Sequence, residues 1–489
     1  MILKMRKLFY EFLFIGCILL PGPMKILAQK VDQHDAAAIA GNYLHSRIPE
    51  LSISYGEAFL DSQDTLAWVF HCQPMGFIII SANQYLPPIL AWSTEGDFAE
   101  GEAWENFLTI FRLDLKTRIQ FAKPEAQESN LNLQKWVYWM NPASKGWKFE
   151  QWPPEGWSST GGWLFTNWTQ NSPYNALCPI DGQTHIRSFA GCPAIAMAQI
   201  VNFHHDIKQT RFSDDDDYYH NFGTGNKYWI DNDWANYGFP SWDQLNEHLD
   251  TLETHYMNGI SLNNTDNAAL TYACGAAAKQ VYSSSVSGTY GIDQAYEAFI
   301  RFGYSDAQLV YPADTSLNTR LAGNIKLALP AQLGLVNPGG TAGHNVVVDG
   351  YNTDELFHFN FGWGGSGNGW YTMPPSSIPY NLTVIEGIVL DINLSFPPVG
   401  LEPGIQDDLQ PEIFYISDAG ELRIVLPETI SVTYVSVFDN AGRMIISSSV
   451  DHGNSQFSIN LPTNRLVRGI YIVRLVTENG RSFSLKFVR

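Results

Sequence analysis

Two stretches rich in proline and glycine divide this chain into three parts. The first covers residues 147–162, which contain three tryptophans, two prolines and three glycines. The second covers residues 396–404, with three prolines and two glycines. Such residues interrupt helices and strands, and 489 residues exceed what one hydrophobic core normally organises. We therefore expect domains at residues 29–155, 156–397 and 412–489, with a linker at 398–411.

The N-terminal 28 residues have the pattern of a signal peptide. Positive side chains come first, at Lys4, Arg6 and Lys7, and a short apolar segment follows from Phe12 to Leu20. Ala28 offers a small residue at the expected cleavage point, which assigns residues 1–28 to the signal. The apolar segment is too short to span a bilayer. A buried N-terminal helix or strand is the alternative interpretation.

Composition narrows the class of protein. Charged residues make up 16% and aromatic residues 13% of the chain, which is typical of a packed globular protein rather than a disordered one. The formal net charge is −20, and such a surface repels phosphate backbones, so we do not expect a nucleic-acid partner. Without the signal, four cysteines remain, which permits two disulfides, although a chain of this length does not need them.

Local patterns predict the class of each flanking domain. In the first, apolar residues at helical spacing near residues 36–44 and a polar helix near 106–122 flank strands near 66–71 and 76–81. We expect a small α+β unit. The last domain alternates apolar and polar residues in short segments separated by turns such as Asn479-Gly480, which predicts a β-sandwich of about seven strands.

Cys192 is the candidate nucleophile of the middle domain. It precedes Pro193 and a run of good helix formers, and proline suits the first turn of a helix. We therefore place the thiol at a helix N-terminus, where the macrodipole is expected to lower its pKa. Gly191 permits a tight turn and close approach of a substrate. A lone cysteine is more often a small buried side chain, so a partner is required.

His344 is the candidate base. It follows a glycine-rich loop, enters an apolar strand, and lies 152 residues after Cys192, which is close to the separation in papain-type enzymes. Asn360 ends the next apolar segment and is expected to accept from the His344 ring and fix its tautomer. We expect Trp363 to shield that bond, and Gln170 to join the Cys192 N–H in an oxyanion hole.

Residues 163 to about 392 resemble streptopain-type cysteine peptidases, a papain-like family of secreted bacterial enzymes. The matching segments are Trp168-Thr169-Gln170 with Ser172-Pro173-Tyr174-Asn175, Gly191-Cys192-Pro193-Ala194 to Gln199, Gly343-His344 with Val348-Asp349-Gly350-Tyr351, and Asn360-Phe361-Gly362-Trp363-Gly364-Gly365. The resemblance implies a fold of a helical lobe and an antiparallel β lobe, with Cys192, His344, Gln170, Asn360 and Trp363 in the roles given above. It also implies endopeptidase activity that prefers an apolar residue before the cleaved one, and a substrate-side loop at Tyr282–Gly291. Phe361 departs from the family, which often has tryptophan there, and Asn345 stands where alanine is usual.

The flanking domains carry resemblances of their own. Residues 76–90 resemble the propeptide of the same family, which implies an intramolecular inhibitor that holds the histidine away from the cysteine. Val437-Phe438-Asp439 and Gly469-Ile470-Tyr471 resemble the sorting domain of type IX secretion cargo. That implies a Gram-negative cell, export through its outer membrane by the type IX machinery, and removal of the tail.

Two other functions and two metal sites are alternatives to this interpretation. A transglutaminase or amidase would use a similar cysteine and histidine, and a surface adhesin would keep the fold without the chemistry. The four carboxylates of Asp214–Asp217 and the cluster His204-His205-Asp206 contain metal-ligand types, but a solvated loop and an exposed helix end explain them more simply. We expect no cofactor and no metal.

Overall fold

The computed structural model describes four continuous parts of the chain and the strands of its C-terminal region. These are residues 30–99, 104–123, 126–141 and 149–393, followed by 412–416, 421–425, 432–439, 444–449, 458–462, 466, 469–477 and 482–488. The predicted signal peptide and the predicted linker at 398–411 lie outside the described residues. Among the described residues, none of the helices combines the length and apolar character that a membrane span requires.

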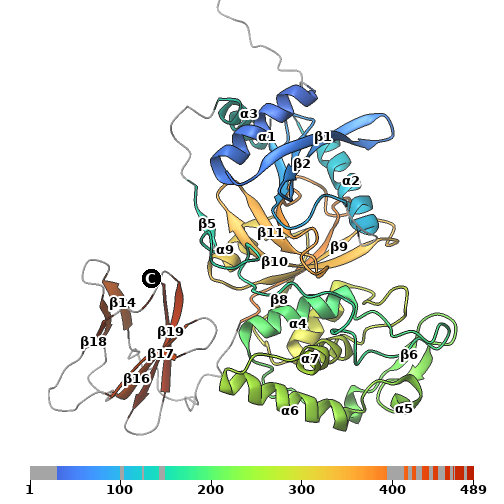
Figure 1. The fold of residues 1–489 in the computed structure, drawn as a ribbon, viewed down its shortest axis with the longest axis vertical. Coiled ribbons are helices and arrows are strands. Elements are labelled where there is room, and N and C mark those ends of the chain that lie inside the picture. Colours follow the sequence, from blue (N-terminus) through green and yellow to red (C-terminus); the bar gives the residue numbers. More distant parts are fainter. Residues whose placement is uncertain are drawn as a thin grey trace, which may run out of the picture.

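The N-terminal unit is a four-stranded antiparallel sheet with helices on both faces (Figure 1). Its elements are α1 (Gln33–Arg47), β1 (Ser52–Asp61), β2 (Asp64–Gln73), β3 (Phe77–Ser81), β4 (Ile89–Ser93), α2 (Trp104–Phe121) and α3 (Gln127–Met140). The expected α+β class is confirmed, whereas β1, β4 and α3 were not predicted. Asp32 caps α1 by accepting from the Asp35 N–H.

The sequence of β3 explains why helices pack on both faces of this sheet. Its five residues are all buried, and successive side chains of a strand point to opposite faces. Phe77 and Ile79 belong to the apolar core that includes α2, whereas Ile78 and Ile80 belong to the core formed with α1 and α3. A continuous apolar segment is the expected sequence for a strand in the middle of such a three-layer unit.

The helical lobe surrounds one central helix, α4 (Cys192–His204), in which nine residues are buried. Its core also includes residues of α6 and α7, and both helices begin with a capping box, at Ser241 and Asn263. The elements of this lobe and its connections are α4, a 3-10 turn at Asp214–Asp216, β6 (Tyr219–Asn221), β7 (Lys227–Trp229), α5 (Trp234–Tyr237), α6 (Trp242–Asn258), α7 (Asn264–Ala277) and α8 (Ile292–Arg301).

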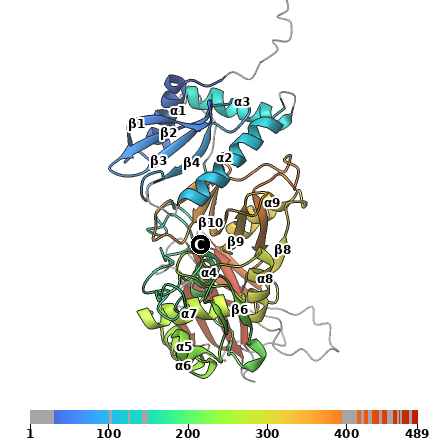
Figure 2. The same ribbon diagram turned by 90° about the vertical axis from the view of Figure 1, so that its right-hand side faces the viewer.

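The β lobe continues the sheet of the N-terminal unit. The strand order is β1-β2-β3-β4-β12-β11-β10-β9-β13-β8, and β5 pairs with β10. The elements are β5 (Gln151–Trp152), β8 (Gln308–Val310), α9 (Leu317–Lys326), β9 (Ala331–Val336), β10 (Gly343–Asn352), β11 (Leu356–Asn360), β12 (Gly369–Thr372) and β13 (Ile385–Leu390). Figure 2 shows the N-terminal unit above this lobe and the helical lobe below it. The expected helical and antiparallel β lobes are confirmed.

The junction between the two units is the pairing of β4 with β12, where Trp370 lies opposite Trp92 and Tyr371 opposite Ala91. The N-terminal unit and the β lobe therefore share one eleven-stranded sheet and one apolar core. Strand β5 already pairs with β10 a few residues before position 156, so the sheet of the middle domain begins ahead of the boundary predicted at 155/156, and that boundary stays a prediction.

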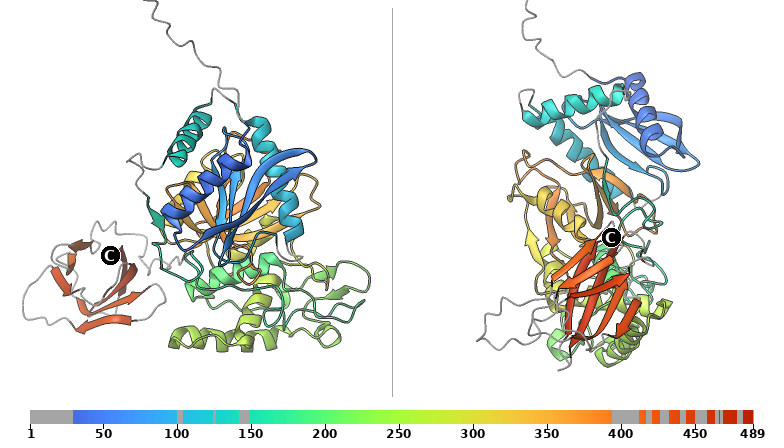
Figure 3. Two further views of the ribbon diagram at one scale, coloured as in Figure 1. Left: turned by 45° about the horizontal axis from the view of Figure 1, so that its top comes forward. Right: turned by 90° about the vertical axis from the view of Figure 1, so that its left-hand side faces the viewer.

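The C-terminal region forms two small antiparallel sheets (Figure 3). They contain β14 (Glu412–Ile416), β15 (Glu421–Val425) and β18 (Ser458–Pro462) in one sheet, and β17 (Met444–Ser449), β16 (Val432–Asp439), β19 (Ile470–Thr477) and β20 (Ser482–Val488) in the other. Residues of both sheets meet in one core, including Leu422, Ile424, Val435 and Val473. The predicted sandwich of about seven strands is therefore confirmed in the described part of this region.

Candidate active site

Cys192 begins α4, where the two lobes meet. The preceding Gly191 has φ +85°, and a Cβ there would lie 2.6 Å from the Gln280 side-chain oxygen, so glycine is needed. The Cys192 Sγ accepts from the backbone N–H of Asn345, on β10, at 3.4 Å. The predicted helix start is confirmed. Contact with β10 places the thiol beside the residue that follows His344.

The expected low pKa of the thiol is wrong for this structure. Burial raises the pKa of Cys192 to about 11, although hydrogen bonds from the Asn345 N–H and the Cys192 N–H lower it in part. The N-terminus of a helix favours a thiolate, but here the loss of solvent outweighs that effect. Cys192 is therefore a neutral thiol at neutral pH in the arrangement described.

His344 lies at the start of β10, near the cysteine in the fold but not bonded to it. Its Nε2 donates to the backbone oxygen of Phe361 at 2.9 Å, which assigns the ring proton to Nε2 and leaves Nδ1 as the basic nitrogen. Burial lowers the pKa of His344 to about 4, so the ring is neutral. Within the described residues no hydrogen bond joins His344 to Cys192. The pair therefore carries no thiolate–imidazolium charge in this structure.

Asn360, expected to orient His344, takes other partners. Its Nδ2 donates to the Thr166 oxygen at 2.8 Å, and its Oδ1 accepts from Gly362 N at 3.1 Å and from Gln199 Nε2 at 3.3 Å. Phe361 supplies the acceptor for His344 through its main chain. The predicted role of Asn360 stays a prediction, and here its side chain fixes the turn that presents the Phe361 carbonyl.

Gln199 ends one of the segments that resemble the family, but no role was predicted for it, and in the structure it joins the two lobes. It lies on α4, is 0% exposed, and its Oε1 accepts from Thr166 Oγ1 at 3.0 Å and from Trp168 N at 3.1 Å. Together with the bond to Asn360, these contacts tie the nucleophile helix to the histidine side of the site. A glutamine on an apolar helix face was the available signal, because a buried amide needs partners.

Trp363 packs against the His344 ring, with centroids 4.7 Å apart. On its other side it meets two rings from α2 of the N-terminal unit, Trp104 at 5.8 Å and Phe107 at 6.4 Å. The same two rings contact Phe361. The structure thus places Trp363 beside His344, as expected, and adds an aromatic connection to the N-terminal unit.

Gln170 lies on the segment that approaches both halves of the site. Its backbone oxygen accepts from Ala190 N at 2.9 Å, two residues before Cys192. The neighbouring Thr169 forms a β-bridge with Trp363, and Gly364 N donates to the Trp168 oxygen. The segment therefore lies next to the residues that precede Cys192, and the assignment of Gln170 to the oxyanion hole stays a prediction.

The two metal-site alternatives raised from the sequence, Asp214–Asp217 and His204-His205-Asp206, share no residue with this site. Asp216 pairs with Arg301 at 2.8 Å, and burial lowers the pKa of His204 to about 4. Among the described residues, neither acidic run nor histidine cluster brings three ligand atoms within 4.8 Å of one another. Cys72, Cys178 and Cys274 are unpaired and buried.

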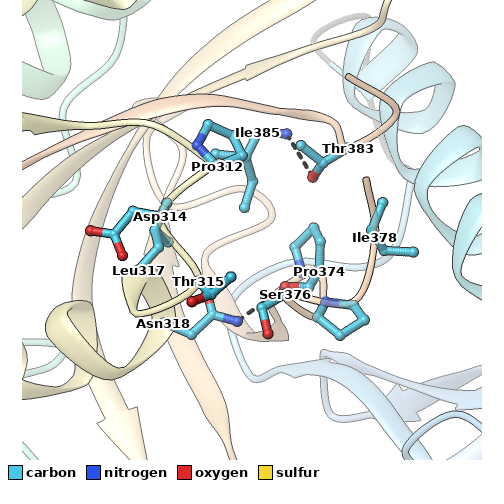
Figure 4. A pocket seen from close by; sticks show the side chains of 11 residues that line it. Pro312, Asp314, Thr315, Leu317, Asn318, Pro374, Ser376, Ile378, Thr383 and Ile385 are labelled. Carbon is cyan, nitrogen blue, oxygen red and sulfur yellow. Dashed lines mark hydrogen bonds between the residues drawn. The ribbon is translucent and has the colours of Figure 1, made fainter. Parts of the chain in front are cut away.

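A pocket lies between the start of α9 and the segment after β12 (Figure 4). Prolines, polar residues and the apolar side chains of Leu317, Ile378 and Ile385 line it. Asn318 donates to the Pro374 oxygen at 3.0 Å. Its only lining residue with a charged side chain is Asp314. None of the candidate active-site residues lines this pocket.

Comparison with known protein families agrees with this geometry. Residues 168–371 match the Peptidase C10 family, residues 28–119 match the Spi protease inhibitor family, and residues 418–488 match the secretion system C-terminal sorting domain. The chain carries a Peptidase C10 domain. Streptopain is the type of this family, so the resemblance stated from the sequence is confirmed. The sorting domain indicates a secreted or cell-surface protein.

Individual relatives are more distant. The thiol protease/hemagglutinin PrtT of Porphyromonas gingivalis is 24% identical over 395 residues, which cover 75% of this chain and 41% of that protein. A prointerpain A fragment of Prevotella intermedia is 22% identical with a TM-score of 0.45, covering 69% of this chain and 98% of the fragment. Active interpain A of the same organism is 23% identical with a TM-score of 0.35, covering 49% of this chain and 98% of that one.

Proposed function

We propose that this protein is a secreted cysteine endopeptidase that is made as an inactive precursor. The observation that carries the proposal is the meeting of Cys192 and the start of β10 between the lobes of a Peptidase C10 domain. Cys192 attacks the peptide carbonyl, and His344 Nδ1 takes the thiol proton and later gives it to the leaving amine. This role needs the unprotonated Nδ1 that the bond from Nε2 to Phe361 provides.

We infer the other roles from the positions of the residues around Cys192 and His344. Gln170 and the Cys192 N–H stabilise the oxyanion, Trp363 shields the His344 ring, and Asn360 fixes the turn that orients it. We infer that the loop Tyr282–Gly291 lies on the substrate side, and its approach to the start of α4, where a Cβ on Gly288 would be 3.9 Å from Pro193, supports this. Val286 and Tyr290 of this loop are 54% and 75% exposed, which supports a preference for apolar peptide residues.

We further propose that residues 29–155 inhibit the enzyme until they are removed. The inhibitor-family match and the contacts of α2 with Phe361 and Trp363 support this. A neutral Cys192 and a neutral His344 that are not bonded to each other are the expected features of an inactive precursor. The C-terminal sandwich then directs export through the outer membrane by the type IX machinery and is cut off afterwards.

The substitution Cys192→Ala tests the nucleophile. We expect hydrolysis of casein by the activated protein to fall by at least about 10³-fold, since the remaining groups cannot form the acyl-enzyme. Cys274→Ala is the matched control, because Cys274 is a fully buried cysteine of the same lobe outside the site. Casein hydrolysis by Cys192→Ala at the wild-type rate would refute the proposal.

A further inference from the structure

The loop that joins β11 to the first residue of β12, residues Phe361–Gly369, contacts the His344 ring through Phe361 and Trp363. The Phe361 oxygen accepts from Nε2 at 2.9 Å, and the Trp363 ring lies 4.7 Å from the imidazole. The position of His344 therefore depends on the conformation of this loop. The N-terminal unit contacts the loop at several points, and one of them is made by a charged side chain.

A chain of hydrogen bonds leads from Glu95, in the segment after β4, to Phe361. The Glu95 carboxylate accepts from Asn167 Nδ2 at 3.0 Å, and Asn167 Oδ1 accepts from Asn368 Nδ2 at 2.8 Å. Asn368 Oδ1 in turn accepts from Phe361 N at 2.9 Å. Each amide side chain uses both its ends, so the orientation of one fixes the next. The chain ends at the residue whose oxygen holds His344.

The loop is shaped to receive this carboxylate. Gly365 has φ +97°, and a Cβ there would lie 3.0 Å from Glu95 Oε2 and 3.1 Å from Asn167 Nδ2, so a larger residue would displace the contact. Ser93 makes a second contact with the loop, because its hydroxyl donates to the Asn368 backbone oxygen. The Ser93 hydroxyl oxygen also accepts from Glu95 N at 2.9 Å, which positions the glutamate.

We propose that Glu95 is the residue through which the N-terminal unit positions the Phe361–Gly369 loop and with it His344, and that this hold weakens when Glu95 loses its proton. Glu95, Asn167 and Asn368 are thus positioning residues, and they act on His344 through the Phe361 main chain. This inference rests on the proposed inhibitory role of residues 29–155, and it adds a pH dependence that such a role does not require.

The surroundings of Glu95 explain the pH dependence. Burial raises the pKa of Glu95 to about 7, against lowering by His358 and the Asn167 hydrogen bond, while Asp349 raises it further. His358 on β11 and Asp349 on β10 face it as a pair, with Nδ1 and Oδ1 2.6 Å apart. A carboxyl with a raised pKa in the docked state stabilises docking at low pH, and this stabilisation is lost as pH rises through about 7.

Hydrogen–deuterium exchange on the full-length Cys192→Ala precursor measures the contact between the N-terminal unit and the loop directly. This variant lacks the proposed nucleophile, so we expect it to remain uncleaved. Peptides covering residues 361–372 report opening of the loop and of the β4–β12 pair. After correction for the intrinsic pH dependence, we expect opening to increase about tenfold between pH 5.5 and 7.5. Glu95→Gln removes a titrating group but keeps its shape, and should abolish this increase.

Two further variants separate the inference from a general charge effect. Glu105→Gln changes the net charge equally at an exposed position of α2 and should keep the wild-type increase. Asn167→Ala should loosen residues 361–369 at both pH values, and adding Glu95→Gln should change that region no further, since the two residues act in one chain.

The inference would be overturned if Glu95→Gln kept the wild-type increase in loop opening between pH 5.5 and 7.5, or if Glu105→Gln lost that increase. Neither result bears on inhibition itself, which is tested by whether separating residues 29–155 from the enzyme raises peptidase activity. The two proposals therefore fail in different experiments.

Discussion

The two halves of the candidate site are held in different ways. Cys192 begins a helix whose buried residues belong to the core of its own lobe, and Gly191 and Gln280 fix the approach to it from the same lobe. His344 instead depends on a loop that packs against Trp104 and Phe107 of the N-terminal unit. Removing that unit therefore changes the support of the histidine far more than the position of the cysteine.

The largest consequence concerns the reactivity of the thiol. With a pKa of about 11, Cys192 of the precursor is almost entirely protonated at pH 7. Its alkylation by iodoacetamide should rise about tenfold per pH unit towards pH 11, since only the thiolate reacts. Once the N-terminal unit is removed and His344 can share the proton, we expect the rate at pH 7 to rise by at least about 10²-fold.

Intact-mass spectrometry separates precursor from mature chains and so measures both rates in one sample. Cys178 and Cys274 serve as internal controls, because they are buried in the helical lobe and should remain unmodified in both forms. Equal rates for Cys192 in precursor and mature enzyme would show that the two halves do not differ as described.

The next effect is expected at the contact with the loop. Trp104 is 1% exposed and packs on both Phe361 and Trp363. Trp104→Ala removes this packing at a cost of about 3–5 kcal/mol, and should speed the appearance of mature enzyme on a gel. Trp136→Ala is the matched control, since that buried tryptophan belongs to the other face of the N-terminal sheet. If both variants mature equally fast, general destabilisation accounts for the effect.

The smallest effect should separate Asn360 from the residues that perform the chemistry. Asn360 is 1% exposed, and its loss leaves the Thr166 oxygen and the Gln199 amide short of partners. We expect Asn360→Ala to lower the free energy of unfolding by about 1–3 kcal/mol, measured by urea denaturation of the activated enzyme. Its kcat should fall much less than that of His344→Ala. Equal losses of kcat in the two variants would support the role predicted from the sequence, in which Asn360 orients His344.

Sequence patterns predicted the elements whose signals are local. Proline after Cys192 and alternating residues such as those of β16 each determine structure within a few positions, and both were found where expected. The acceptor for His344 was missed because it is a backbone oxygen, which no residue type reveals. The pairing of β4 with β12 was also missed, since it joins strands more than 270 residues apart and carries no spacing signal.

The β4–β12 pair has a consequence for the mature enzyme. If the N-terminal unit is removed, β12 changes from an interior strand to the edge of the remaining sheet; Trp370 and Tyr371 stay paired with β11, and the main-chain groups of β12 that face β4 lose their partners. Free edges invite pairing between molecules. This edge is only four residues long and begins at a glycine, which limits how far a second chain can extend along it. Removal of the N-terminal unit would thus expose a new strand edge of four residues.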